Sequence, residues 1–243
     1  MPIKPIAVIA GVGAGTGASI ARKFAQTYSM ALLARSSTSY QTLVHEISSS
    51  GGNAVGINTD VTSDASVENA FAEIARAFPG APLAAGIYNV GGAFVRKPFL
   101  DISQEDFTAG YESNAKGAFH FSQAVLPLLL KSVNLEHPPT LVFTGATASL
   151  KGSAFCSSFA TGKFALRALS QSLAREFGPQ GIHVCHAIID GVIDIERTKG
   201  FQFEAPDAKL SPHSIADTYW FLHTQPRTTF TQELDLRPYV EKW

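Results

Sequence analysis

The sequence predicts an α/β fold in which a doubly wound parallel sheet of about seven strands carries helices on both faces. Short apolar runs alternate with longer segments of helical periodicity, which is the pattern of strands joined by crossover helices. Strands such as 183–189 are almost continuously apolar, and this indicates a sheet that is covered on both faces. No internal repeat, charge block or long linker divides the 243 residues, so we expect one domain, 1–243.

Each predicted strand is an apolar run bounded by turn residues, and each predicted helix is a longer segment with helical spacing. The segment 196–210 has neither pattern and contains Gly200 and Pro206, so we interpret it as a substrate flap or as a plain connection. The predicted strands are 6–10, 31–34, 54–58, 84–89, 140–144, 182–189 and 231–236. The predicted helices are 17–27, 40–49, 63–77, 104–130, 155–177 and 212–223.

Composition excludes several classes of protein. The chain has 19 Lys and Arg against 20 Asp and Glu, a formal net charge of −1, which gives no electrostatic reason to expect nucleic acid or an anionic membrane as a partner. Two cysteines, Cys156 and Cys185, are too few for a disulfide framework or a zinc site, so we expect no metal. No run approaches about 18 uninterrupted apolar residues, and we expect a cytoplasmic protein without a membrane span.

A glycine-rich turn follows the first strand. Gly11, Gly15 and Gly17 permit a tight turn, a close approach of the backbone to a pyrophosphate, and close packing of the next helix on the sheet. The N-terminus of that helix, near Thr16, offers free N–H groups to an anion. Because strand, turn and helix occur in the required order, we predict a dinucleotide site. A structural turn without a ligand is the alternative.

The end of the second strand predicts which dinucleotide binds. Instead of an acidic side chain, which would bind the ribose hydroxyls of NAD, the chain has Ala34 and Arg35 there, followed by Ser36 and Ser37. A guanidinium with neighbouring hydroxyl groups can bind a 2′-phosphate. We therefore predict NADP(H) rather than NAD(H); an exposed, solvated Arg35 is the alternative.

These motifs resemble those of the short-chain dehydrogenase/reductase family, which has a Rossmann-type fold, and the resemblance runs from residue 6 to about residue 236. It implies that adenine, ribose and nicotinamide contacts come from residues spread along the chain. The departure after the sixth strand is that the family's proline and threonine are missing from 190–195. The matching positions are Gly11, Gly15, Thr16 and Gly17 in the turn, Asp60 and Val61 after the third strand, Asn89 and Gly91 after the fourth, Asn114 in a helix, and Ile193 after the sixth.

Two of the family's four catalytic side chains are absent. The Y-x-x-x-K pattern falls on 159–163, so Lys163 is present but Phe159 replaces the tyrosine. Ala146 stands thirteen residues earlier, where the family has its catalytic serine. General acid catalysis is worth about 10²–10⁴ in rate and one oxyanion donor about 10²–10³. Carbonyl reduction by this degenerate site therefore needs another proton donor.

Several side chains are candidates for the missing roles. Asp190 leads because it replaces a proline and because a partly buried carboxyl can act as an acid near neutral pH; a turn or capping role is the alternative. Lys163 is expected to hold the ribose of the nicotinamide half, and Asn114 to hold a water through the adjacent backbone or to serve as an ordinary helix residue. The weaker candidates are Thr144, Thr147, Asp194 and His186, which strand-end or core roles also explain.

The sequence leaves three functions open. The first is an NADP(H)-dependent oxidoreductase that reduces a carbonyl, enone or imine of a small-molecule substrate with a non-standard proton donor. The second is a non-redox reaction such as isomerisation, dehydration or cyclisation, and the third is nucleotide binding without catalysis. The predicted helices 104–130 and 155–177 carry more apolar residues than one sheet face needs. This favours a homodimer or homotetramer, as the family resemblance implies; packing in the protein's own core is the alternative.

Overall fold

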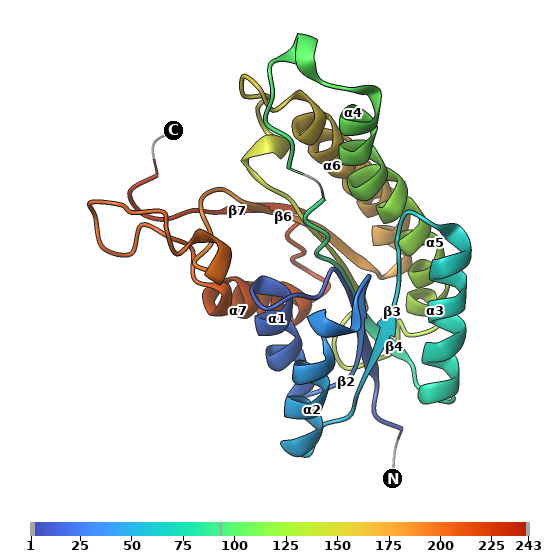
Figure 1. The fold of residues 1–243 in the computed structure, drawn as a ribbon. Helices are drawn as coiled ribbons and strands as arrows, with labels where there is room; N and C mark the ends of the chain where they lie inside the picture. The colour runs from blue at the N-terminus through green and yellow to red at the C-terminus, as the bar shows by residue number, and fades with distance from the viewer. Residues whose placement is uncertain (1–2, 93, 242–243) are drawn as a thin grey trace.

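The structure, a computed structural model, describes residues 3–92 and 94–241 and contains one seven-stranded sheet (Figure 1). All neighbouring strands pair in parallel, in the order β3-β2-β1-β4-β5-β6-β7. The predicted doubly wound parallel sheet of about seven strands is confirmed. The strands are β1 (Ile6–Ala10), β2 (Ser29–Ala34), β3 (Ala54–Asn58), β4 (Leu83–Tyr88), β5 (Thr140–Thr144), β6 (His183–Ile189) and β7 (Glu233–Leu236).

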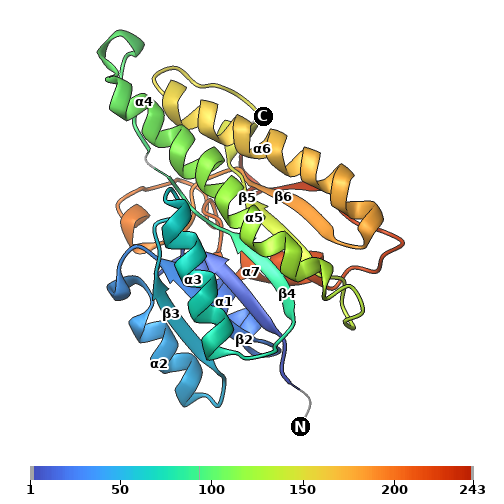
Figure 2. The same ribbon diagram turned by 90° about the vertical axis from the view of Figure 1, so that its right-hand side faces the viewer.

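Helices cover both faces of the sheet (Figures 1 and 2). Each face has its own cluster of buried apolar side chains, with Phe24 and Tyr219 in one cluster and Phe121 and Leu166 in the other. Among the described residues, no helix is long and apolar enough to cross a membrane. One face carries α1 (Thr16–Ala25), α2 (Gln41–Ser49) and α7 (Pro212–His223); the other carries α3 (Asp64–Ala77), α5 (Gly117–Leu130) and α6 (Ser157–Phe177).

The predicted helix 104–130 is interrupted, which corrects the sequence-based expectation. It consists of α4 (Gln104–Tyr111), a π-helical turn at Glu112–Lys116, and α5, and Figure 2 shows these pieces running as one rod beside α6. A π turn adds a residue without ending the helix, so the segment still has the length and composition of a single helix in the sequence. The other predicted elements are confirmed, with ends that differ by at most two residues.

The strand order determines where a ligand can enter. The chain runs outward from β1 through β2 to β3, then returns to place β4 on the other side of β1. The crossover helices therefore lie on opposite faces on the two sides of this point, and a crevice opens beyond the carboxyl ends of β1 and β4. The segments that follow these strands form the site described below.

Helices α1 and α7 are joined by a cluster of buried aromatic rings. The ring of Phe24 packs edge-to-face on Trp220, with centroids 5.2 Å apart, and also lies beside Tyr28. His223 completes the cluster: Nε2 lies 2.7 Å from the Tyr28 hydroxyl and Nδ1 lies 2.9 Å from Thr140 Oγ1. Burial lowers the pKa of His223 to about 3, so its ring is neutral at pH 7 and both nitrogens have a hydrogen-bond partner.

The substitution Phe24→Ala is expected to lower the free energy of unfolding by about 3–5 kcal/mol, because it leaves a cavity among packed rings. Phe24 has an exposed fraction of 0%, whereas Phe221 on α7 is 58% exposed, which makes Phe221→Ala the matched control. The control is expected to change stability by less than about 0.5 kcal/mol. Urea unfolding followed by circular dichroism measures both, and equal losses in the two variants would contradict this packing.

Candidate active site

A cavity of about 740 Å³ lies at the carboxyl edge of the sheet. Its walls come from the turn after β1 and from the segments that follow β4, β5 and β6, together with the first turns of α6. This is the size and placement of a cofactor site in an α/β protein. Lining residues that matter below are Gly15, Asn89, Ala146, Thr147, Phe159 and Lys163.

The glycine turn has the backbone geometry that the sequence predicts. Gly11 has φ +86°, and a Cβ atom there would lie 2.6 Å from the backbone carbonyl carbon of Asn89. At Gly17 a Cβ would lie 2.9 Å from the Gly11 carbonyl oxygen, so a side chain is excluded at both positions. Helix α1 begins at Thr16, which places its free N–H groups at the cavity wall.

A chain of hydrogen bonds ties this turn to the neighbouring strands. Asn89 Nδ2 donates to the Gly11 carbonyl oxygen at 3.0 Å, and Thr144 Oγ1 donates to Asn89 Oδ1 at 3.1 Å. Tyr219 of α7, whose hydroxyl lies 2.8 Å from Thr144 Oγ1, then acts as the donor to Thr144. The hydroxyl proton of Thr144 is thus engaged in holding the strand ends together.

The predicted adenine end lies at the ends of β2 and β3. Arg35 and Ser36 are exposed directly after β2, and Ser36 Oγ accepts from the Thr38 N–H to cap a short 3₁₀ turn. Asp60 Oδ1 accepts from the Thr62 N–H at 3.0 Å and from its hydroxyl at 2.8 Å. The neighbouring Val61 is buried, and its carbonyl oxygen lies 3.0 Å from Nδ1 of His120.

Lys163 reaches the cavity from α6 and is buried, with an exposed fraction of 2%. Its Nζ donates to the Thr144 carbonyl oxygen at 2.9 Å and lies 5.8 Å from the centroid of the Phe159 ring. Burial lowers the pKa of this ammonium to about 8. The lysine is therefore held with its amine at the cavity wall, beside a ring that has no hydroxyl.

The wall next to Lys163 is apolar. Phe159 packs edge-to-face on Phe94 with ring centroids 5.2 Å apart, and both rings line the cavity together with Ala146. The position of Phe94 in the site has no signal in the sequence, because it lies in an irregular segment after β4. An apolar portion of a substrate fits against this aromatic pair.

Asn114 lies in the π turn between α4 and α5 and is fully buried. Its Nδ2 donates to the Gly110 carbonyl oxygen at 2.9 Å, whereas Oδ1 has no hydrogen-bond partner among the described residues. A Cβ on Gly162 would lie 2.2 Å from the Gly110 carbonyl oxygen and 3.3 Å from the Cβ of Asn114, so this glycine lets α4 and the π turn approach α6. A buried acceptor without a partner fits an ordered water.

Asp190 directly follows β6 and lies behind Thr147, which lines the cavity. Thr147 Oγ1 donates a hydrogen bond to Asp190 Oδ1, and Nη2 of Arg237 lies 3.1 Å from Asp190 Oδ2. Two candidates that the sequence offered separately are thus in contact, and Arg237 is a partner that sequence reasoning missed. Asp194, by contrast, is exposed and lies 3.7 Å from the Lys209 ammonium.

The segment that follows β6 closes one side of the cavity. Ile193 and Ile195 line it, and the backbone of Ile193 pairs with that of Leu210 in an isolated bridge. The Lys209 ammonium donates to the Thr198 carbonyl oxygen at 2.8 Å across the same loop. The predicted flap 196–210 therefore begins and ends next to the cavity; its movement stays a prediction.

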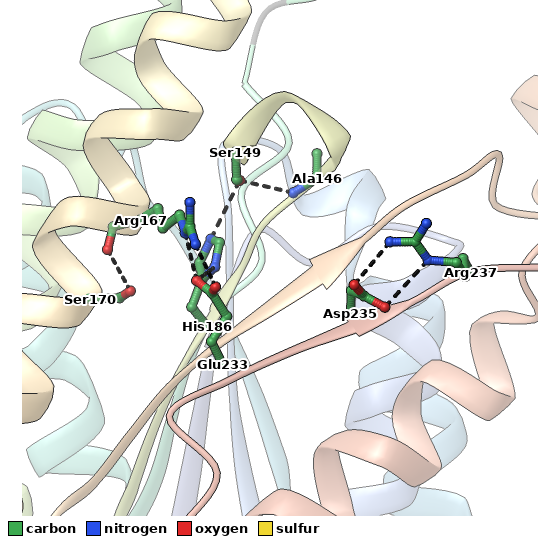
Figure 3. Close-up of polar contacts among 8 residues, drawn as sticks. All are labelled: Ala146, Ser149, Arg167, Ser170, His186, Glu233, Asp235 and Arg237. Atoms are coloured by element: carbon green, nitrogen blue, oxygen red, sulfur yellow. Dashed lines mark hydrogen bonds and ion pairs between the residues drawn. The ribbon is translucent and has the colours of Figure 1, made fainter. Parts of the chain in front are cut away.

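A buried polar chain lies on the other side of the loop after β5 (Figure 3). The Ala146 N–H donates to Ser149 Oγ at 3.1 Å, and Ser149 Oγ lies 3.4 Å from Nε2 of His186. His186 Nδ1 lies 3.3 Å from Glu233, whose carboxylate binds Arg167 through two contacts of 2.7 Å.

Burial lowers the pKa of His186 to about 4, so its ring is neutral at pH 7. The hydrogen bonds from Arg167 lower the pKa of Glu233, which favours its charged form. A neutral His186 that donates from Nδ1 to this carboxylate has Nε2 free to accept from the Ser149 hydroxyl. His186 therefore has a structural role in this chain, which was the alternative to acid catalysis.

Comparisons with known proteins point to one family. The model of the short chain dehydrogenase family matches residues 5–202. An uncharacterized oxidoreductase of Staphylococcus epidermidis is 26% identical over 234 residues, which are 96% of each chain.

Solved structures share the fold over almost the whole chain. A short-chain dehydrogenase from Rhodopseudomonas palustris has a TM-score of 0.80 and 32% identity, and the match covers 98% of this chain and 100% of that one. An alcohol dehydrogenase from the archaeon Thermococcus sibiricus, complexed with 5-hydroxy-NADP, has a TM-score of 0.84 and 24% identity over 98% of each chain, which shows the fold alone. With its Rossmann-type sheet, its glycine turn and these matches, the chain belongs to the short-chain dehydrogenase family.

Proposed function

We propose that this protein is an NADP(H)-dependent oxidoreductase that interconverts a carbonyl, enone or imine and its reduced form on a small apolar substrate. The observation that carries the proposal is the presence in one cavity of the glycine turn and of the buried Lys163. The family relationship supports the reaction class. The structural relatives from Thermococcus sibiricus and from a metagenomic source, described as complexes with 5-hydroxy-NADP and NADP, support the cofactor.

The residues at the carboxyl edge fit a dinucleotide. The N-terminus of α1 and the turn Gly11 to Gly17 would hold the pyrophosphate, because no Cβ blocks the backbone at Gly11 or Gly17. Arg35 and Ser36 would bind the 2′-phosphate. The remaining contacts that we propose are Gly15 and Thr16 at the pyrophosphate, Asp60 and Val61 at the adenine, and Asn89, Gly91, Lys163 and Ile193 at the ribose and nicotinamide.

Each residue of the site has a separate role in the proposed reaction. NADP(H), when bound, supplies or accepts the hydride. Lys163 would orient the ribose through its ammonium. Burial and the hydrogen bond to the Thr144 carbonyl oxygen hold this ammonium at the cavity wall. Asn114 holds a water at its unpartnered Oδ1, and Asp190 takes part in proton transfer from behind the wall. Phe94 and Phe159 form an apolar wall at the reacting end.

We also propose that the protein forms a homodimer or homotetramer through α4, α5 and α6. Large apolar side chains are exposed on these helices, although α5 and α6 already bury other apolar side chains against the sheet. Such a surface is typical of a subunit interface. The exposed residues are Phe107 and Tyr111 on α4, Phe119 on α5 and Phe164 on α6.

The fate of the cofactor tests the proposed reaction. We expect purified protein with NADPH to reduce a member of a panel of acetophenone, cyclohexenone and 2-methyl-1-pyrroline, with loss of the absorbance band of the reduced nicotinamide. Product formation without loss of that band would support a non-redox reaction instead. Tight NADPH binding without product from any panel member would support a nucleotide-binding protein without catalysis.

Arg35→Ala is expected to weaken NADPH binding about 10- to 100-fold and to leave NADH binding unchanged, because charge-assisted hydrogen bonds contribute about 1.5–3 kcal/mol. Calorimetric titration with both nucleotides measures the effect. Arg76→Ala, which removes an exposed guanidinium from α3, is the control and should change neither affinity. Equal weakening of NADPH and NADH, or none, would contradict the assignment of the 2′-phosphate to Arg35.

NADPH affinity is expected to fall about tenfold as the pH rises from 7 to 9. The folded protein's Lys163 has a pKa lowered to about 8, so the ammonium that donates to the ribose is present below pH 8 and is lost above it. Lys163→Met should bind more weakly and show no such dependence. Lys131→Met, an exposed lysine after α5, should behave as the unmodified protein. Fluorescence titrations with NADPH at each pH measure the affinity. If the affinity of Lys163→Met still falls between pH 7 and 9, a group other than Lys163 causes the pH dependence.

A further inference from the structure

We propose that Thr147 and Asp190 replace the missing tyrosine as a proton-transfer pair. Thr147 contacts the substrate oxygen, and Asp190 exchanges the proton with it through the hydrogen bond between them. This inference rests on the proposed oxidoreductase function and names the groups that move the proton in it.

Thr147 lies between the cavity and a buried carboxyl group. It begins the short 3₁₀ helix Thr147–Ser149, lines the cavity, and follows Ala146, which stands where the family has its catalytic serine. Asp190 is buried behind it directly after β6, with an exposed fraction of 7%. A ligand in the cavity therefore reaches Asp190 through the Thr147 hydroxyl.

Arg237 places a positive charge beside Asp190, on the side away from Thr147 Oγ1. Its guanidinium lies 3.1 Å from Asp190 and 2.9 Å from Asp235, so both side chains form ion pairs with it (Figure 3 shows Arg237 on Asp235). A carboxylate accepts the Thr147 hydrogen bond, as the contact between Oγ1 and Oδ1 shows. The lone pairs of Thr147 Oγ1 stay available to accept a proton from a substrate hydroxyl.

The step balances in the direction of alcohol oxidation. The substrate O–H bond breaks and its proton joins Thr147 Oγ1, while the Thr147 proton moves to Asp190 Oδ1 and leaves later to water. The C–H bond of the same alcohol breaks with its electron pair, which reduces NADP⁺ by one hydride. The alcohol thus loses one hydride, which carries two electrons, and one proton. Carbonyl reduction is the same set of transfers in reverse.

The short helix that carries Thr147 is held from both ends. Thr147, the first residue of this helix, is hydrogen-bonded to Asp190. Ser149, its last residue, contacts His186, and the chain of contacts continues to Glu233 and Arg167 (Figure 3). His186 and Asp190 both belong to the β6 region, so one strand positions both contacts. Ser149, His186 and Glu233 are positioning residues in this account.

Among the described residues, the other hydroxyl groups that line the cavity, those of Thr16, Thr144 and Ser153, have no hydrogen bond to a carboxylate. The Thr144 proton goes to Asn89, and the Ser158 hydroxyl of α6 donates to the Asp106 carbonyl oxygen at 2.6 Å. Ser149 is fully buried and lies outside the cavity lining. In the described part of the chain, Thr147 is the cavity-lining hydroxyl that is hydrogen-bonded to a carboxylate.

Kinetics of three variants test the pair. With the responsive member of the panel above and with its reduced form (1-phenylethanol for acetophenone), Thr147→Val should lower kcat about 10²- to 10⁴-fold and leave NADPH affinity unchanged. Thr147→Ser should keep most of the rate, and Asp190→Asn should lose as much as Thr147→Val. Thr161→Val, which removes an exposed hydroxyl from α6, is the control and should match the unmodified protein.

A measurement on the cofactor-free protein provides a second readout. The ¹³C-carboxyl signal of Asp190, identified by its loss in Asp190→Asn, should shift in Thr147→Val and stay in place in Thr161→Val. Melting temperatures check that each variant is folded. A wild-type rate in Thr147→Val, or an unshifted Asp190 signal, overturns the inference and leaves the proposed function standing. Absence of turnover in the unmodified protein with every panel member overturns the proposed function and the inference with it.

Discussion

The close approach of the Gly11 backbone to Asn89, at the point where the sheet changes direction, is the constraint on which the site depends. A Cβ at Gly11 would lie 2.6 Å from the Asn89 backbone, and the Asn89 amide binds the Gly11 carbonyl. Thr144 then joins the same chain from β5, and its carbonyl oxygen receives Lys163. Four elements of the fold thus meet at one edge through a few short hydrogen bonds, and the cavity is the space that they enclose.

The part of the site that would bind the cofactor and the part that would transfer the proton differ in the kinds of residue that form them. The turn, the N-terminus of α1 and Lys163 keep the geometry that a dinucleotide requires. The proposed reacting end has two apolar lining residues, Ala146 and Phe159, and beside them a hydroxyl that is bonded to a carboxylate. Because Asp190 accepts the hydrogen bond of the Thr147 hydroxyl, this arrangement offers a path for a proton between the substrate and Asp190.

Sequence reasoning recovered the sheet and the helices because apolar spacing records burial directly. It also found the glycine turn, since that is a local pattern, whereas the replacement of the catalytic tyrosine by Phe159 stays a prediction. It missed the π turn at Asn114, where the segment has the length and composition of a single helix, and it missed Glu233 and Arg237, whose roles depend on β7 lying beside β6. Asp190 was recognisable as unusual, but its contact with Thr147 joins segments far apart in the chain and required the fold.

The most direct test is a crystal structure of the protein grown with NADP⁺. The account predicts the pyrophosphate on the turn from Gly11 to Gly17, the 2′-phosphate beside Arg35, and the nicotinamide at the wall formed by Thr147 and Phe159. A nucleotide bound elsewhere, or a cavity that stays empty at saturating NADP⁺, would contradict it.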